Sequence, residues 1–569
     1  MMKSTLMACA LTLSMLLAAL PAFAGESGSD DGIAEWTFII YMDGDNNLEG
    51  AAVADFNELE IAGSTANVNI VVLFDRIPGE DSSEGDWTGT RKYLVQKDDN
   101  LGAFGQYDEG VNVWGSETEE ELNMGDPNVL VNFTNWAIDA YPAQRYFIDL
   151  WNHGGAFWGV CWDDSSGGDG DCINMTEMSS ALCAVTTHAE RKMDIVGFDA
   201  CLMAQVAVLY QMADYCDYSV ASAFAEPGDG WPYEKFMPDL VANPTMAPQD
   251  LGKMMVDDYM DSYTDRQQDP QDSFQVSMAC FDMSRIPDVA RALSELGMVL
   301  ATGTSLSVES SYYAQLRWVR SNTKSYDLAP VGPFDLGQYC IYDAVDFLDK
   351  LNTLPSASQV QIVSEEKAMQ FRAAISDSIV HSRANNAQFA VHCLTFYFPS
   401  GTQTVYDERY SATKYAKEMY WDDFLHNFDA ETFEANFPPS VYLSAPEADT
   451  LVQPEQTSVH VAGEAYDVQN SVIMVQVKLD DGSWINAAGT TNWTAILPTI
   501  DLAPGMHTIS ARSYDGTGYS PEVQRTILAP QPPAPSTPKE SYDYLPMSIG
   551  LIVLAAIICA AAIVIKRKR

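Results

Sequence analysis

The pattern that most limits the fold is a repeated alternation between short, wholly apolar runs and longer amphipathic stretches. Amphipathic stretches at 48–62 and 129–140 lie between runs rich in β-branched and aromatic residues. Strands that are apolar on both faces and separated by helices predict a mostly parallel sheet covered by helices on both sides. We therefore expect an α/β domain that ends near residue 437. The runs are WTFIIYMDG (36–44), VNIVVLFD (68–75), RYFIDLWNHGG (145–155) and MDIVGFDAC (193–201).

The pattern changes after Pro438 and Pro439. From there to residue 528, short stretches such as SVHVAGEAYD alternate apolar and polar residues and are bounded by Pro, Gly and Asp. The DDG sequence between Leu479 and Ser483 is a hairpin turn signal. This spacing predicts an immunoglobulin-like β-sandwich over 438–528. A Pro-rich, semi-rigid linker follows over 529–544.

The two ends of the chain carry targeting signals. Residues 1–24 hold a lysine, an apolar run and an A-x-A site, the pattern of a secretory signal peptide, so the mature domain is expected to start at residue 25. Residues 545–565 contain no charge and precede the basic tail 566–569. A run of about 20 apolar residues matches a bilayer core. We expect a single-pass protein of the cell membrane, with most of the chain outside the cell.

Charge narrows the range of partners. The chain has 79 acidic and 31 basic residues, for a formal net charge of −48. Because nucleic acids bind through positive charge, this balance argues against a nucleic-acid partner. It favours a soluble acidic surface and the attraction of cationic substrates.

Two residues lie at the ends of expected strands, where a catalytic site could form. His153 follows one apolar run and precedes two glycines, while Cys201 follows another run. Ligands of open α/β sheets bind at the carboxyl ends of strands, so the two residues could act as a base and a nucleophile. We read residues 201–212 as a helix, whose N-terminus would favour the Cys201 thiolate. From the pattern alone, a core role for Cys201 stays open, since buried cysteines are common.

At these residues the chain resembles the clostripain family of cysteine peptidases. The His-Gly-Gly and Asp-Ala-Cys-Leu-Met motifs are specific together, and the similarity covers most of 36–428. The resemblance implies a caspase-like fold and a dyad in which Cys201 attacks the peptide carbonyl and His153 transfers protons. The backbone N–H groups of Gly154 and Cys201 would bind the oxyanion. The four main segments are WTFIIYMDGDNNLE (36–49), IDLWNHGGAFWG (148–159), DIVGFDACLMA (194–204) and SAFAEPGDGWPY (222–233).

The resemblance also implies a preference for Arg or Lys before the cut. By motif position, Asp199 and Asp229 would be the acids of the first substrate pocket, where a basic side chain would compensate their charge. The alternative is structural: Asp199 would cap the following helix, and Asp229 would be a turn residue.

Activation and metal binding are less defined. Relatives are often activated by self-cleavage between the catalytic His and Cys, yet residues 156–190 contain no Lys or Arg, and Arg191 and Lys192 are the sole basic candidates. The chemistry implied by the resemblance requires no cofactor. The family sometimes uses calcium, which the acidic run WDDSSGGDGD (162–171) could bind, although a solvated loop is the alternative. Compact ligand spacing for a zinc site of His153, Cys161 and Cys172 is absent.

Taken together, the sequence predicts a cell-surface cysteine endopeptidase that cuts peptides or proteins after Arg or Lys. One alternative is a surface-binding or adhesion protein with a catalytically silent caspase-like domain, against which the presence of both His153 and Cys201 argues. Another is a transpeptidase that processes surface proteins, because an amine can capture an acyl-enzyme in place of water.

Overall fold

We analysed a computed structural model of the chain, which describes most of the two folded regions. The described residues are 33–100, 102, 111–112, 121–166, 170–266, 276–302, 309–326, 340–385, 393–399, 407–429, 438–446, 450–453, 456–467, 471–500 and 502–529. Within these ranges no helix is long and apolar enough to cross a bilayer. The signal peptide and the membrane helix expected from the sequence, 1–24 and 545–565, lie outside them.

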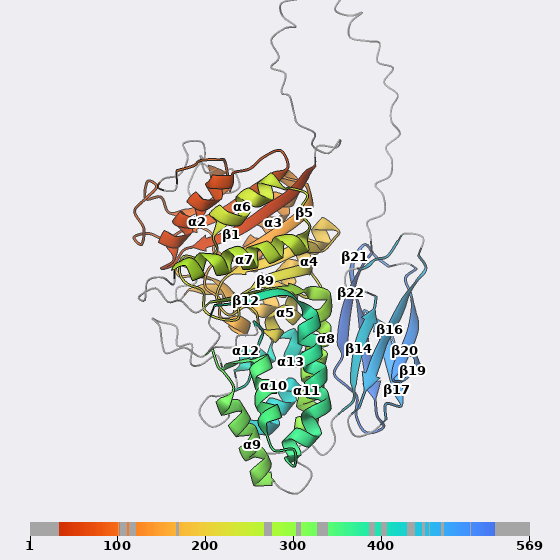
Figure 1. Ribbon diagram of the computed structural model, residues 1–569. Coiled ribbons are helices and arrows are strands. Elements are labelled where there is room, and N and C mark those ends of the chain that lie inside the picture. Colours follow the sequence, from red (N-terminus) through yellow and green to blue (C-terminus); the bar gives the residue numbers. More distant parts are fainter. Residues whose placement is uncertain are drawn as a thin grey trace, which may run out of the picture.

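A nine-stranded sheet forms the centre of the first region (Figure 1). Its order is β12-β10-β9-β8-β5-β1-β2-β3-β4, and neighbours from β9 to β2 run parallel. Antiparallel strands complete both edges. The mostly parallel sheet predicted from the apolar runs is confirmed. The strands are β1 (Ala34–Gly44), β2 (Val68–Arg76), β3 (Gly89–Leu94), β4 (Val111–Asn112), β5 (Ala143–Trp151), β8 (Met193–Asp199), β9 (Cys216–Ala221), β10 (Ser277–Asp282) and β12 (Ile379–Ala384).

Helices cover both faces of this sheet. On β1, Phe38 and Ile40 pack in one hydrophobic cluster, whereas Ile39 and Tyr41 pack in the other. Successive strand residues point to opposite faces, so a continuous apolar run serves both clusters. On one face lie α2 (Glu49–Ala62), α6 (Tyr233–Ala242) and α7 (Pro248–Arg266), seen in front of the sheet in Figure 1. On the other lie α3 (Pro127–Ala140), α4 (Met175–Ala189), α5 (Val206–Met212) and α8 (Ile286–Thr302).

Further elements extend the first region below the sheet in Figure 1. A two-stranded sheet of β11 and β13 packs among helices whose aromatic residues include Trp421 and Phe347. These elements are η3 (Met283–Arg285), α9 (Glu309–Asn322), β11 (Ile341–Asp343), α10 (Ala344–Thr353), α11 (Gln359–Ser378), β13 (Thr395–Tyr397), α12 (Glu408–Ser411), α13 (Lys414–Glu418) and α14 (Trp421–Asp429).

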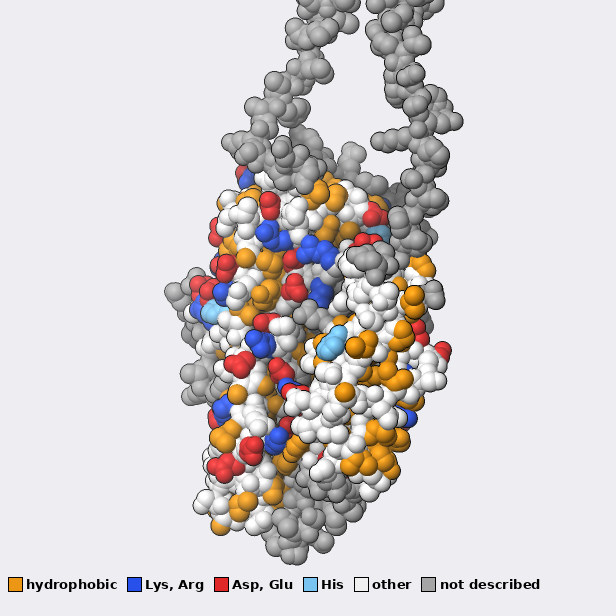
Figure 2. Space-filling view, turned by 90° about the vertical axis from the view of Figure 1, so that its right-hand side faces the viewer, with side chains coloured by type: hydrophobic (Ala, Val, Ile, Leu, Met, Phe, Trp, Pro, Cys, Tyr) orange, Lys and Arg blue, Asp and Glu red, His pale blue; other side chains and the backbone are white. Residues whose placement is uncertain are grey.

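The C-terminal region is rich in β-structure, with two sheets that share one apolar core containing Trp493. Figure 2 shows apolar side chains on the outward surface of this region. Ile496 is 66% exposed. The immunoglobulin-like assignment and the boundary near residue 437 stay predictions. The strands are β14 (Ser440–Ala445), β15 (Thr450–Leu451), β16 (Ser458–Tyr466), β17 (Met474–Leu479), β18 (Ile485–Asn486), β19 (Ala488–Gly489), β20 (Asn492–Pro498), β21 (Gly505–Tyr514) and β22 (Val523–Ala529).

A buried ion cluster joins the two regions. Asp214, beside α5, receives Arg525 Nη1 of β22 at 2.6 Å and also contacts Lys414 Nζ of α13. Burial alone raises the pKa of Asp214, but the charges of Lys414 and Arg525 outweigh this effect and hold the pKa well below its usual range. The carboxylate therefore stays charged between its two partners.

We expect Asp214→Asn to lower the free energy of unfolding by about 3 kcal/mol, because buried Lys414 and Arg525 would lose the negative charge that they share. Since folding depresses the pKa of Asp214, its contribution is complete above the unfolded value of about pH 4 and is lost as pH falls further. Urea denaturation at pH 7 measures the loss. Asp139→Asn, which removes the exposed partner of His188, is the control and should change stability by less than about 0.5 kcal/mol.

None of the eight described cysteines forms a disulfide, and most of them are buried. Cys201 is one of the three that are partly exposed; the others are Cys172 and Cys183.

Candidate active site

His153 and Cys201 follow neighbouring parallel strands at the same edge of the sheet. β5 pairs with β8, and Trp151 lies opposite Asp199 at their carboxyl ends. The N–H of Asn152 donates to the Asp199 carbonyl at 3.2 Å, which continues the pairing by one residue. His153 and Cys201 each lie two residues beyond the paired positions. The structure therefore brings together the two loops that the sequence singled out.

Gly154 lies very close to the backbone of Cys201. A Cβ atom built on Gly154 would lie 2.1 Å from the carbonyl oxygen and 2.9 Å from the nitrogen of Cys201. Both distances are far below a van der Waals contact, so the two backbones meet at a point where only glycine fits.

Asn152 holds the loop that carries His153. Its Oδ1 accepts from the Trp162 N–H at 3.0 Å and from the N–H of His153 itself. Its Nδ2 donates to the carbonyl oxygens of Asp43, at 2.7 Å, and Trp162, at 3.1 Å. The strand β6 (Val160–Asp163), which pairs with β7 (Asp171–Ile173), and the short helix η2 (Ala156–Trp158) are thus tied to the end of β1.

The imidazole of His153 contacts Asn47. The distance from Nε2 to Asn47 Oδ1 is 2.9 Å. With the amide in this orientation its oxygen accepts, so Nε2 carries the ring proton and Nδ1 the lone pair. Burial lowers the pKa of His153 to about 4, which keeps the imidazole neutral at neutral pH. Asn47 comes from the loop after β1; it lies in segment 36–49 of the family resemblance, but no sequence motif assigned it a role.

The Cys201 thiol lies against Glu226. The N–H of Glu226 donates to Sγ at 3.2 Å, and the Glu226 carbonyl oxygen lies 3.8 Å from Sγ. Burial raises the pKa of the Cys201 thiol, and the N–H of Glu226 partly offsets this effect. The resting site therefore combines a neutral thiol with a neutral imidazole.

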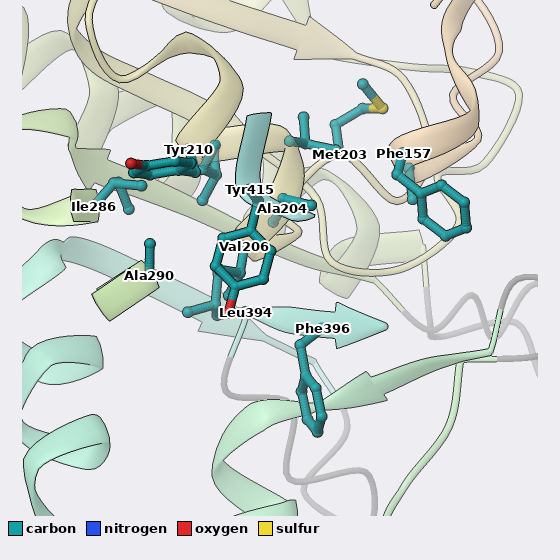
Figure 3. Packing of buried hydrophobic residues seen from close by; sticks show 14 of the residues in the cluster. Phe157, Met203, Ala204, Val206, Tyr210, Ile286, Ala290, Leu394, Phe396 and Tyr415 are labelled. Atoms are coloured by element: carbon teal, nitrogen blue, oxygen red, sulfur yellow. The ribbon is translucent and has the colours of Figure 1, made fainter. Parts of the chain in front are cut away.

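The expected helix N-terminus at Cys201 is wrong. α5 starts at Val206, and Leu202 adopts a left-handed φ of 68°. The N–H groups of Leu202 and Ala204 donate to the carbonyls of Phe224 and Ser222, at 3.0 and 2.9 Å. Figure 3 shows Met203, Ala204 and Val206 among buried side chains that include Phe157, Leu394 and Tyr415. Burying this apolar segment against the 222–224 loop outweighs its helical pattern, so a helix dipole does not act on the thiol.

Asp199 lies directly before the Cys201 turn and is buried. Its Oδ2 accepts from the Trp231 N–H and the Tyr233 hydroxyl, both at 3.0 Å, so it does not cap a helix. Burial raises its pKa to about 6, although those hydrogen bonds and a further one with Glu226 lower it. The capping alternative for Asp199 is therefore wrong.

Glu226 and Asp55, which the sequence pattern did not single out, also adjoin Asp199. Glu226 has both carboxyl oxygens buried, and apart from the neighbouring Asp199 carboxyl they have no partner among the described residues. A Cβ on Gly230 would lie 2.9 Å from Asp199 Oδ2 and 3.1 Å from Asp55 Oδ2, so Asp55 completes the group. Glu226 lies three residues before Asp229 in the same motif, whereas Asp55 comes from α2 and carried no sequence signal.

Asp229 differs from the other acids. It is exposed in a turn that Gly230 closes by donating to the Pro227 carbonyl at 3.1 Å. Its charge contributes to the raised pKa of Asp55, after burial and the charges of Asp199 and Glu58. Asp229 thus belongs to the rim of the acid group, with Asp199 at its base.

The zinc candidates of the sequence do not form a ligand cluster within the described part of the chain. Within the described part of the chain, one set of His, Cys, Asp and Glu ligand atoms lies close enough together to share an ion, and it consists of Asp45, Asp75 and Glu121. A zinc set of His153, Cys161 and Cys172 is not among them. The acidic run 162–171 contains residues outside the described ranges, but its Ser165 contacts Asp45.

The comparisons with known proteins agree with this architecture. The model of the Clostripain family matches residues 40–428, which is most of the chain. The chain belongs to the clostripain family. Clostripain from Hathewaya histolytica is 26% identical over 427 residues, which cover 66% of this chain and 77% of that protein. Membership makes the chain a cysteine endopeptidase, as the sequence resemblance predicted.

Two solved structures show similarity in shape. A secreted C11 cysteine protease from Bacteroides thetaiotaomicron, in complex with an irreversible peptide inhibitor, has a TM-score of 0.49 and 17% identity, covering 69% of this chain and 99% of that one. An inactive zymogen C11 protease from Parabacteroides distasonis has a TM-score of 0.48 and 17% identity, covering 68% and 99%.

Proposed function

We propose that this member of the clostripain family is a cell-surface endopeptidase that cuts after Arg or Lys, with Cys201 as nucleophile and His153 as proton carrier. The observation that carries the specificity is the buried group of acids beside Cys201. Among the described residues, neither Lys nor Arg forms an ion pair with Asp55, Asp199 or Glu226. A basic side chain of a substrate would supply the missing positive charge.

The proposed chemistry starts from the neutral pair. Cys201 Sγ attacks the peptide carbonyl carbon and its proton passes to the His153 imidazole, while the carbonyl oxygen becomes an oxyanion. The N–H groups of Gly154 and Cys201, which lie on two closely approaching loops, would donate to that oxygen. The C–N bond then breaks as His153 gives the proton to the leaving amine.

Water completes the cycle. His153 takes a proton from the water that attacks the thioester, and returns it to sulfur when the C–S bond breaks. A neutral imidazole is the form needed to accept both protons, which agrees with the low pKa of His153. The ring hydrogen bond to Asn47 would fix its tautomer.

The acids of the pocket give a direct test. We expect Asp199→Asn to lower kcat/KM on an Arg amide substrate by about 100-fold, because truncation of a buried charge pair costs a few kcal/mol. Glu226→Gln should lower it by about 10-fold or more for the same reason. Since the pKa of Asp199 is about 6, its carboxylate gains its charge as pH rises through that value. Wild-type kcat/KM should therefore rise with pH through about 6 and then level off, and this rise should be absent in Asp199→Asn.

Asp194→Asn is the matched control, because Asp194 is a buried carboxylate at the opposite end of the same strand, paired with Arg191. It should leave the ratio of Arg to uncharged citrulline substrates unchanged. If Asp199→Asn and Glu226→Gln also retain that ratio, the acids do not select the basic side chain.

The rest of the chain fits a surface location. Under the proposal, residues 1–24 direct secretion and residues 545–565 anchor the chain in the membrane. The 438–528 region, as an immunoglobulin-like spacer, and the 529–544 linker together separate the peptidase from the membrane. The test is to treat intact cells with a protease. We expect the treatment to release the active peptidase and to leave a fragment containing 566–569 in the membrane fraction.

A further inference from the structure

A cavity of about 620 Å³ lies between the β6–β7 hairpin, the first turn of α4 and α12. Pockets of about 300 to 1,000 Å³ with mostly apolar walls are typical ligand-binding sites. The chemistry proposed for His153 and Cys201 gives this cavity no role. Its apolar walls are Phe157, Trp158, Trp162, Cys172, Met175 and Ala412.

Trp162 connects the cavity to the loop that carries His153. A Cβ atom built on Gly155 would lie 2.8 Å from Cη2 of the Trp162 indole, so the ring lies directly on the backbone two residues after His153. The backbone of Trp162 is bonded to the Asn152 side chain, through its N–H at 3.0 Å and its carbonyl at 3.1 Å. Since Asn152 also holds the backbone of His153, the indole has a fixed position beside the catalytic loop.

Trp158 forms a second fixed wall of the cavity. The central carbon of the Arg409 guanidinium lies 3.7 Å from the centre of the Trp158 ring. Arg409 in turn donates to both carboxylate oxygens of Asp407, from Nε at 2.9 Å and from Nη2 at 2.7 Å. A wall that is held in place before binding loses little conformational freedom when a ligand packs against it, which favours affinity.

The charged groups around the cavity are already paired, as Arg409 is. Asp171 Oδ2 accepts from Asn123 Nδ2 at 2.7 Å, and Glu177 Oε2 accepts from the N–H of Asn174 at 3.0 Å. Because these groups do not require a ligand of opposite charge, the cavity suits an apolar side chain. A planar aromatic ring would fit best, since aromatic pairs gain stability beyond the burial of their area.

The cavity and the buried acids lie on opposite faces of the central sheet. Phe157 packs in the hydrophobic cluster on the face covered by α4, whereas Tyr233, which donates to Asp199, packs in the cluster on the face covered by α2 and α6. His153 and Cys201 follow β5 and β8 at the edge between these faces. A peptide that crosses this edge with its basic side chain among the acids therefore directs its other end toward the cavity.

We propose that this cavity binds an aromatic side chain of the substrate, within about three residues after the cut bond. An extended peptide advances about 3.4 Å per residue, so three residues reach about 10 Å beyond the cut and past the loop of His153. The inference rests on the proposed function, because His153 would protonate the leaving amine and the cavity adjoins its loop. The enzyme would then read the residue before the cut by charge and the sequence after it by aromatic packing.

Internally quenched peptides that differ at one position test this subsite. Each contains a single Arg, followed either by Ala residues alone or by Ala residues with one Phe at the first, second or third position. For wild type, we expect Phe at one of these positions to raise kcat/KM by about 10-fold or more over Ala, the effect of burying an aromatic side chain. Two variants should abolish most of this preference. Trp158→Ala removes a wall, and Ala412→Trp fills the cavity from an exposed position, where it is safe for folding.

The ratio of Phe to Ala peptides cancels any general change in activity, because both peptides share the Arg residue and the Cys201–His153 chemistry. Trp318→Ala is the matched control, since Trp318 is an exposed indole on α9, and it should keep the wild-type ratio. A wild-type ratio near one at all three positions would overturn the subsite. A preference for Phe that survives in both Trp158→Ala and Ala412→Trp would overturn it as well.

Calorimetric titration of the same peptides into Cys201→Ala separates the subsite from the proposed function, because it measures binding without hydrolysis. We expect one of the Phe peptides to bind about 10-fold more tightly than the Ala peptide, and this difference to be lost when Ala412→Trp is added. Tighter binding of a Phe peptide, without hydrolysis after Arg by wild type, would refute the proposed function and support the subsite. Hydrolysis after Arg with equal binding of the Phe and Ala peptides would overturn the subsite and leave the proposed function intact.

Discussion

Replacing Cys201 with alanine should abolish peptide hydrolysis, with kcat/KM on an Arg amide substrate falling by at least about 10⁴-fold. The Cys201 thiol is the proposed nucleophile at the carboxyl edge where β5 and β8 meet. Removing it leaves the acid pocket and the proposed oxyanion donors without the group that forms the acyl-enzyme. Purified wild type and variant are compared at pH 7.5, with circular dichroism to show that both are folded.

Cys183→Ala is the matched control. Cys183 is also a partly exposed cysteine, but it lies on α4 and contacts Met506 of the C-terminal region. Activity close to that of wild type is expected for this variant. Hydrolysis that survives in Cys201→Ala, or that is lost equally in Cys183→Ala, would exclude the proposed mechanism.

Gly154→Ala should lower kcat/KM by about 100-fold or more although it adds a single methyl group. The new Cβ would lie 2.1 Å from a backbone oxygen of Cys201, so one of the two loops must move. A displacement of about 1 Å in an active site can cost about 100-fold, and loss of an oxyanion donor costs about as much or more. Since both Gly154 and Cys201 contribute the proposed donors, most of the loss should appear in kcat.

Gly50→Ala gives the comparison for Gly154→Ala. A Cβ on Gly50 of α2 would lie 3.5 Å from its nearest neighbour, which is an ordinary contact. This variant should retain wild-type kcat and gain slight stability from the higher helix propensity of alanine. If Gly154→Ala keeps wild-type kcat as well, the close approach of the two loops has no part in catalysis.

The sheet and the shared edge of His153 and Cys201 could be predicted because they depend on local patterns. Apolar runs such as that of β1 form strands buried on both faces, and parallel neighbours bring their carboxyl ends together. The segment after Cys201 could not be predicted, because its apolar periodicity is equally compatible with a helix and with a buried turn. Its hydrogen bonds to Phe224 and Ser222 decide between them.

The acids around Cys201 were only partly predictable. Asp199 and Asp229 follow from the motif, but Glu226 became visible through its backbone contact to the thiol and through its buried carboxyl oxygens beside Asp199. Asp55 comes from α2, and Asn47 comes from the loop before α2. Tertiary packing joins them to residues about 100 to 180 positions later, and no short-range pattern records that contact.

Mapping a covalent label tests the central claim most directly. A peptide chloromethyl ketone ending in arginine should place its arginine in the acid pocket and alkylate Cys201. Mass spectrometry of the digested protein should then find the adduct on the peptide that contains DACLMA. The matching reagent ending in aspartate should leave that peptide unmodified, and Asp199→Asn should slow labelling by the arginine reagent. Label on Cys161, Cys172 or another cysteine, or equal labelling by the arginine and aspartate reagents, would contradict the assignment of Cys201 and of its acid pocket.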